Sequence, residues 1–90
     1  MPAKERAKYI FRIARMISER PRELSVIESM DGGKPIRERR DFDIPAAAKH
    51  FFYYAGWADK LDYAFPKRKP QSLGVATQII PMNFPLLMAA

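Results

Sequence analysis

The first regular pattern of hydrophobic and polar positions lies between residues 4 and 19. Apolar residues recur there at the spacing of one face of an α-helix, at Ile10, Ile13, Ala14 and Ile17. Pro21 suits the first turn of a second helix, where its missing N–H is not needed, and Gly32-Gly33 ends that helix. The pattern predicts a helical hairpin over residues 4–31.

The next segment reads GGKPIRERRDFDIP (residues 32–45), and its glycines and prolines predict a loop. The pair Gly33-Lys34 invites comparison with a phosphate-binding loop. Pro35, however, stands where Ser or Thr should be, and no strand precedes the pair. We therefore interpret the pair as part of a turn.

The longest predicted helix covers residues 46–65. Its main apolar stripe, with further aromatic residues on other faces, consists of Phe51, Tyr54, Ala55, Ala58, Leu61 and Phe65. A helix that is apolar over most of its circumference is buried on several sides. Pro66 and the basic cluster that follows it, KRKP, are expected to end the helix in a turn.

Residues 73–80, LGVATQII, are rich in β-branched side chains and predict a strand. Pro81 and Pro85 follow, and residues 81–90 are expected to form a turn and the start of a helix with Pro85 at its first position. A single strand has no partner for its backbone groups. The chain alone is thus predicted to be mostly α, with three helices, one orphan strand and a helix start, as expected of a fragment.

Composition adds a basic charge and a high apolar content. The 16 Lys and Arg against 10 Asp and Glu give a net charge of +6, but the bases are scattered, which favours a solvated surface over a nucleic-acid patch. The chain has no cysteine, its N-terminus is charged at once, and polar residues and prolines interrupt its charge-free end. We expect a cytoplasmic protein with no membrane span.

Few side chains suggest chemistry. His50 is the only histidine, and its neighbours one helical turn away would not complete a metal site, so no metal is expected. Asp59 and Asp62 are interpreted as solvated helix surface. Asn83 differs, because two prolines flank it just after the predicted strand. Its NH2 group could stabilise a developing oxyanion, or its side chain could cap the following helix; spacing alone favours the cap.

Three sequence pieces carry a resemblance to a known family. The chain contains matches to ES.DGGKPI.E.RD.DIP, FFYYAGWADKL and GV..QIIP.NFPLLMAA, in that order. Together they resemble the N-terminal region of the aldehyde dehydrogenase superfamily. The resemblance implies an α/β fold, so residues 1–90 would be part of a Rossmann-like cofactor-binding domain.

The resemblance also implies a reaction. The family oxidises aldehydes to carboxylic acids with NAD or NADP through a cysteine thiohemiacetal, and its members are typically homo-oligomers. Asn83 matches the asparagine that stabilises the oxyanion. Ile79, Ile80, Pro81 and Met82, with Asn83, match the segment that lines the cofactor cleft. With the resemblance, capping becomes the weaker interpretation of Asn83.

Two departures and one absence qualify this expectation. Met82 stands where the family usually has tryptophan or another aromatic residue, and Thr77 stands where glycine is common. The nucleophilic cysteine and the general-base glutamate are not found in the chain, so the chain alone is expected to be inactive. One alternative is a small basic helical module that binds nucleic acid or an acidic protein. Another is an inactive piece that associates with full-length subunits.

Overall fold

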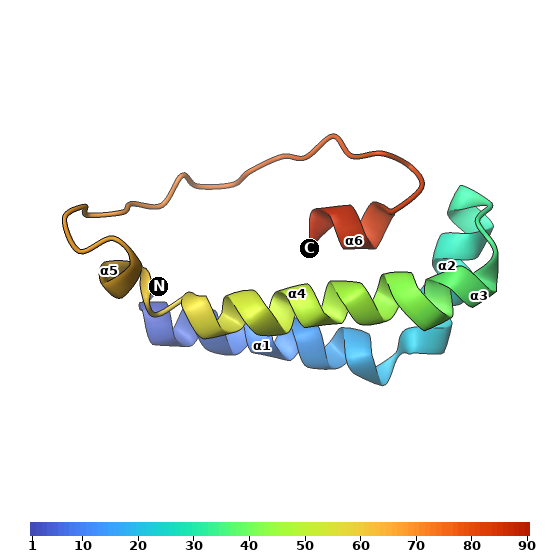
Figure 1. The fold of residues 1–90 in the computed structure, drawn as a ribbon, viewed down its shortest axis with the longest axis horizontal. Helices are drawn as coiled ribbons and strands as arrows, with labels where there is room; N and C mark the ends of the chain where they lie inside the picture. Colours follow the sequence, from blue (N-terminus) through green and yellow to red (C-terminus); the bar gives the residue numbers. More distant parts are fainter.

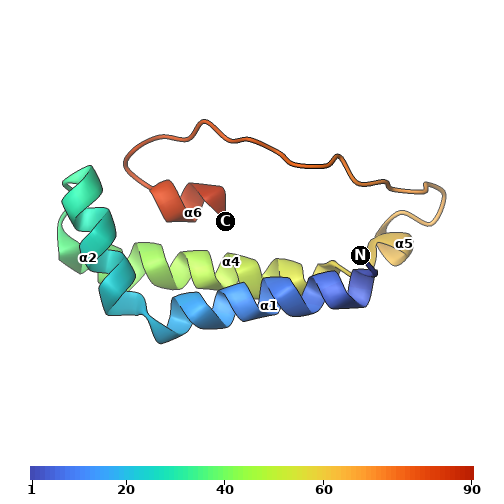
Figure 2. The ribbon, with the colours of Figure 1, turned by 180° about the vertical axis from the view of Figure 1, so that it is seen from behind.

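The computed structural model describes all 90 residues and contains helices but no β-strand. Two long helices, α1 (Ala3–Glu19) and α4 (Ile44–Trp57), lie side by side and antiparallel (Figure 1). Three elements connect them at one end, namely α2 (Pro21–Gly32), the short α3 (Ile36–Glu38) and the π-helix η1 (Arg39–Asp43). The view from behind shows α5 (Leu61–Ala64) at the opposite end and α6 (Pro85–Ala89) over α4 (Figure 2).

Small residues allow α1 and α4 to approach closely. Ala14 on α1 and Ala47 on α4 are completely buried, and Ala55 is nearly so. Ile17 and Ile44 form the centre of the core with Ala48. The side chains packed around this centre come from α2, α4 and α6, and they are Leu24, Phe51 and Leu86. The core therefore lies where α1, α2, α4 and α6 meet.

Residues 4–31 contain the two helices α1 and α2, but these do not form a packed hairpin. The chain bends at Arg20, and α2 turns away from α1 at the end of the molecule (Figure 1). The partner of α1 is α4. Ala14 and Ile17 of the apolar stripe of α1 are thus buried beside the alanine-rich face of a helix distant in sequence, whereas Ile13 of the same stripe is 42% exposed.

The predicted loop over residues 32–45 is mostly helical, which corrects the sequence-based prediction. Gly33 does end α2, with a left-handed φ of 71°. Helical turns resume at Ile36 and run without a break into α4. Pro45 has no N–H to donate to the carbonyl of Asp41, and its ring would press on that carbonyl in a regular α-helix. The wider π-turn just before Pro45 removes this conflict.

The predicted long helix over residues 46–65 is divided in two. Helix α4 begins earlier, at Ile44, and ends at Trp57, and the single turn α5 follows. Its aromatic residues are not buried on several sides, since Tyr53 is 61% exposed and Tyr54 is 54% exposed. Beyond Trp57 no residue of α5 is buried, so no packing extends the helix.

The predicted strand over residues 73–80 is wrong for this chain. The segment is extended, but it makes no backbone ladder. The side chains of Leu73, Val75 and Ile79 are almost fully exposed. A strand needs a neighbour to pair with its N–H and C=O groups, and none is present. No helix of the chain has the length and apolar character needed to cross a membrane.

Candidate functional site

The turn before α6 carries the principal candidate residue, Asn83. Pro85 occupies the first turn of α6, as the sequence predicts, and Phe84 is the N-cap residue. The Asn83 side chain is exposed and makes no hydrogen bond within the chain. The capping interpretation of Asn83 is therefore contradicted, and its amide is directed to solvent-accessible space.

A carboxylate from α2 caps α6 instead. The backbone N–H of Leu86 donates a hydrogen bond to Glu28 Oε1 over 2.8 Å. The first N–H groups of a helix have no partner inside it, and a negative charge near them is favourable. Glu28 is only 8% exposed, so this contact lies inside the protein. It connects residues 58 positions apart in the sequence.

Arg39 lies at the centre of the contacts beneath the turn. Its side chain is completely buried. Its Nη1 atom donates to the backbone carbonyl of Asn83 over 2.9 Å and to Asp43 Oδ2 over 3.1 Å. The same nitrogen lies 3.2 Å from Glu28 Oε2. One guanidinium thus joins α2, η1 and the Asn83 turn.

Lys34 completes the cluster from the loop between α2 and α3. Its Nζ donates to Asp43 Oδ2 over 2.7 Å. The same ammonium lies 4.0 Å from the centre of the Phe84 ring, within the range of a cation–π contact. With two cations and two carboxylates, the cluster of Glu28, Lys34, Arg39 and Asp43 is formally neutral. We call it the polar cluster.

Some buried atoms of the polar cluster lack hydrogen-bond partners. They are Nε and Nη2 of Arg39, Oδ1 of Asp43 and Oε2 of Glu28. The contact between Glu28 Oε2 and Arg39 is consequently an ion pair without hydrogen-bond alignment. Desolvating such charges costs several kcal/mol per ion. The polar cluster therefore favours one arrangement of its elements more than it adds to stability.

The other predicted site residues precede the turn in the extended segment. Ile79, Pro81 and Met82 are exposed, and Ile80 is half-buried. These four residues directly precede Asn83 in the sequence. The polar cluster contacts Asn83 and Phe84, which follow them. His50, Asp59 and Asp62 lie apart from this turn and are exposed.

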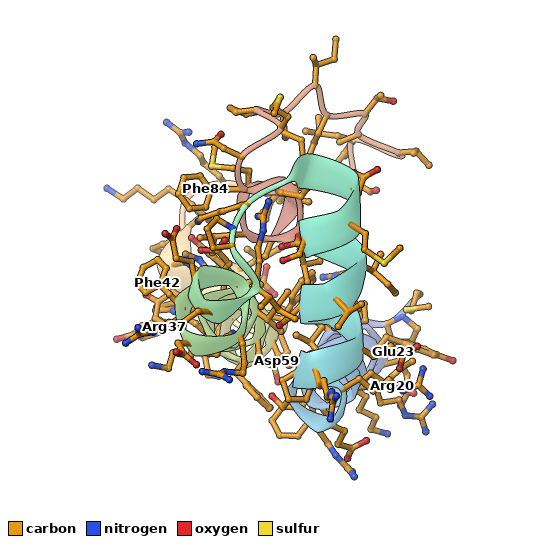
Figure 3. All side chains as sticks on the ribbon, turned by 90° about the vertical axis from the view of Figure 1, so that its right-hand side faces the viewer. Arg20, Glu23, Arg37, Phe42, Asp59 and Phe84 are labelled. Atoms are coloured by element: carbon orange, nitrogen blue, oxygen red, sulfur yellow. The ribbon has the colours of Figure 1, made fainter.

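Several hollows lie on the surface, and two of them are lined by charged side chains at the ends of α2. One is beside Phe84, with Arg37 and Phe42 on the same side of the molecule (Figure 3), and its rim includes Lys34 and Asp41. There the Arg40 guanidinium donates to Asp41, which lowers the pKa of that exposed carboxyl and raises the pKa of Arg40.

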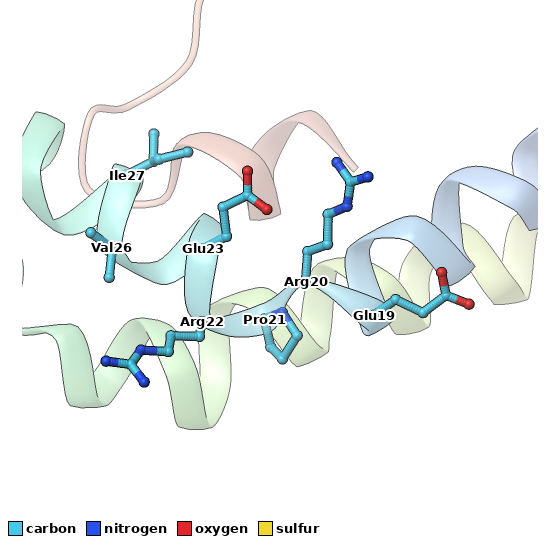
Figure 4. A pocket seen from close by; sticks show the side chains of 7 residues that line it. All are labelled: Glu19, Arg20, Pro21, Arg22, Glu23, Val26 and Ile27. Atoms are coloured by element: carbon cyan, nitrogen blue, oxygen red, sulfur yellow. The ribbon is translucent and has the colours of Figure 1, made fainter.

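The second hollow is at the corner between α1 and α2 (Figure 4). Glu19, Arg20, Arg22 and Glu23 extend from this corner in different directions. Because their charged ends do not converge, the corner presents no arrangement that suggests catalysis.

The sequence interpretation missed the polar cluster. Three of its four members lie in the segment that the glycines and prolines marked as a loop, and Glu28 lies in α2. One signal was available, because Arg39 and Asp43 are four residues apart, the spacing of an ion pair on one helical face. No spacing rule relates Arg39 to Asn83, 44 residues away.

Comparisons with known proteins agree on one family. The sequence model of the aldehyde dehydrogenase family matches residues 1–90. Relatives include benzaldehyde dehydrogenase, mitochondrial, of Antirrhinum majus, which is 41% identical over 98% of this chain and 18% of its own length. Retinal dehydrogenase 2 of Homo sapiens is 40% identical over all of this chain and 19% of its own length. Acetaldehyde dehydrogenase 2 of Cupriavidus necator is 44% identical over 94% of this chain and 18% of its own length.

The chain spans about a fifth of the length of the curated relatives that it matches. The names of the three relatives given above specify three different aldehydes. No solved structure gives a significant match to the chain.

Proposed function

Because the chain belongs to the aldehyde dehydrogenase family, we propose that Asn83 supplies an oxyanion-binding amide to an NAD(P)-dependent enzyme that oxidises aldehydes to carboxylic acids. In this proposal, residues 1–90 are part of a Rossmann-like cofactor-binding domain. The observation that supports it most directly is the exposed side-chain amide of Asn83, which makes no hydrogen bond within the chain. The backbone of its turn is held by hydrogen bonds to Arg39 and Glu28.

The chemistry needs a hydrogen-bond donor at the aldehyde oxygen. When a nucleophile adds to the carbonyl carbon, the oxygen gains negative charge, and a fixed N–H group aimed at it stabilises the transition state. The side-chain NH2 of Asn83 is such a donor, and it remains neutral at every working pH. Because these 90 residues contain no cysteine, the thiolate that attacks the aldehyde must come from outside them.

The segment before the turn fits one wall of a cofactor site. Ile79, Pro81 and Met82 present exposed apolar surface, and Ile80 is half-buried. None of the four carries a charge, so they suit the flat, apolar part of a dinucleotide and not its phosphates. NAD(P), when bound, would accept the hydride that leaves the aldehyde carbon. The residues of this segment would cover the cofactor and exclude water from it.

A chimaeric enzyme tests the proposal. This chain replaces the matching segment of the Antirrhinum majus benzaldehyde dehydrogenase, and formation of NADH or NADPH from benzaldehyde is followed by absorbance. We expect the chimaera to turn over aldehyde. Replacement Asn83→Ala should lower kcat by about 10²–10³-fold, the effect of removing one oxyanion donor, with a much smaller change in the KM for aldehyde.

Met88→Leu is the matched control, because Met88 is an exposed residue of α6 outside the proposed site and the change removes no donor. It should retain kcat within a few-fold. An active chimaera in which Asn83→Ala has the same kcat as the parent would contradict the proposed role of Asn83.

A further inference from the structure

We propose that Arg39 is a positioning residue that holds the backbone of the Asn83 turn and thereby sets the direction in which the amide side chain leaves it. The catalytic value of that amide rests on the function proposed above. The hold on the backbone does not, because it follows from contacts within this chain.

The turn has few other attachments to the body of the molecule. Two hydrogen bonds join residues 66–90 to the preceding helices, and both involve the polar cluster. One runs from Arg39 Nη1 to the carbonyl of Asn83, and the other runs from the N–H of Leu86 to Glu28 Oε1. Between Lys69 and Asn83 no backbone–backbone hydrogen bond constrains the chain. These two bonds, with the packing of Leu86 on the core and of Phe84 on Lys34, therefore hold the turn on the body of the molecule.

The two bonds follow the Asn83 side chain directly along the sequence. The carbonyl of Asn83 and the N–H of Leu86 lie on either side of Phe84 and Pro85, and Pro85 has a restricted φ. The ring of Phe84 also lies against the Lys34 ammonium. With the carbonyl of Asn83 fixed, rotation about its ψ angle is restricted, and the Cα–Cβ bond from which the amide extends keeps one direction.

Arg39 is itself held from two sides. Asp43 Oδ2 accepts from Nη1 at 3.1 Å, and Glu28 Oε2 lies at 3.2 Å. Since a well-packed apolar residue would avoid the cost of burying a charge, stability alone does not account for an arginine here. A donor to the Asn83 carbonyl does account for it, because no other side chain reaches that oxygen.

Gly32 provides the space for this arrangement. A Cβ atom at residue 32 would lie 2.9 Å from Arg39 Nη2 and 3.3 Å from the backbone oxygen of Met82. Both the guanidinium and the turn therefore pack directly on the end of α2. A methyl group there would displace one or both without altering any charge. Gly32 thus gives a second, independent way to disturb the turn.

The test is NMR spectroscopy of the 90-residue chain labelled with ¹³C and ¹⁵N. Arg39→Met removes the donor and keeps an apolar stem of similar length. Arg40→Met is the matched control, because Arg40 is the next residue in η1 and its side chain bonds only the exposed Asp41. The readouts are the ¹³C shift of the Asn83 carbonyl and the exchange rate of the Leu86 amide.

We expect Arg39→Met to change the Asn83 carbonyl shift and to speed exchange of the Leu86 amide by about tenfold or more, as for the loss of hydrogen bonds to charged groups. Amides of α1 and α4 should be accelerated by a clearly smaller factor, because the buried carboxylates of Glu28 and Asp43 lose a partner and the whole chain is somewhat destabilised. Arg40→Met should change neither readout. Gly32→Ala should move the same two signals with the charge of Arg39 intact.

Two results would overturn the proposal. One is an unchanged Asn83 carbonyl shift in Arg39→Met, and the other is equal acceleration of exchange throughout α1, α4 and α6, which would indicate a general loss of stability. If the turn signals respond as expected and Asn83→Ala leaves the kcat of the chimaera unchanged, the positioning role stands and the proposed function fails.

Discussion

Ile17 is the residue whose truncation should most clearly reveal where the stability of this chain resides. It lies on α1 with 6% of its surface exposed and forms the core cluster with Ile44 and Ala48. Leu24 and Leu86 pack against that cluster from α2 and α6. Truncation to alanine removes three carbon atoms at the point where four helices meet, and the surrounding backbone has little freedom to collapse into the space.

Ile17→Ala should lower the free energy of unfolding by about 2–5 kcal/mol, the range for creating a cavity of this kind in a core. A chain of 90 residues has a free energy of unfolding of about 5–13 kcal/mol in total. With ten buried residues, this chain should fall toward the lower end. Ile17→Ala should therefore remove a third or more of the stability, and Ile17→Val should cost only about 0.5–1.5 kcal/mol.

Urea denaturation followed by circular dichroism at the helix band measures these differences. Ile27→Ala is the matched control, because the same atoms are removed from a side chain that is 56% exposed. It should change the free energy of unfolding by less than about 0.5 kcal/mol. The reasoning would be refuted if Ile27→Ala cost as much as Ile17→Ala, since the core would then lie elsewhere.

Three further changes test other parts of the structure. Ala47→Leu should destabilise the chain by about 1–3 kcal/mol in urea denaturation, because the completely buried Ala47 has no room for a larger side chain against α1; equal stability would contradict that packing. Gly33→Ala should lower the free energy of unfolding by about 1 kcal/mol, because alanine disfavours a φ of 71°. An unchanged urea midpoint would contradict the left-handed conformation of Gly33 at the end of α2. Asp41, whose pKa is lowered by the hydrogen bond from Arg40, contributes stability above its unfolded pKa and loses it as pH falls through the folded pKa. The contribution of this exposed pair is small. Asp41→Asn should therefore destabilise the chain slightly near neutral pH in low salt, and it should have no effect at about pH 2. Equal urea midpoints of parent and variant at neutral pH would contradict this expectation.

The helices that the sequence predicts best are those with a clear apolar stripe. Ala14 and Ile17 of the stripe found by spacing alone in residues 4–19 are buried, although Ile13 of the same stripe is exposed. Spacing does not specify the partner, however. The pairing of α1 with α4 depends on Ala47 and Ala55, which match its face only once both helices are placed in space.

The predictions that failed depended on local rules that tertiary contacts override. Pro35 and Pro45 indicate a loop, but the residues between them form helical turns in which Arg39 and Asp43 pair inside the protein. The β-branched residues before Pro81 indicate a strand, but a strand requires a neighbour. The resemblance drew attention to Asn83. Only the structure revealed that Arg39 donates a hydrogen bond to the backbone carbonyl of Asn83.

In the two proposals taken together, the buried Arg39 positions the amide of Asn83, and this amide acts on the substrate. A double-mutant cycle in the chimaeric enzyme tests this combined claim most directly, with kcat measured for the parent, Arg39→Met, Asn83→Ala and the double variant. If Arg39 acts through Asn83, Arg39→Met should lower kcat in the parent and have almost no further effect once Asn83 is alanine. If the two losses in kcat multiply instead, Arg39 acts independently of the amide and the account is contradicted.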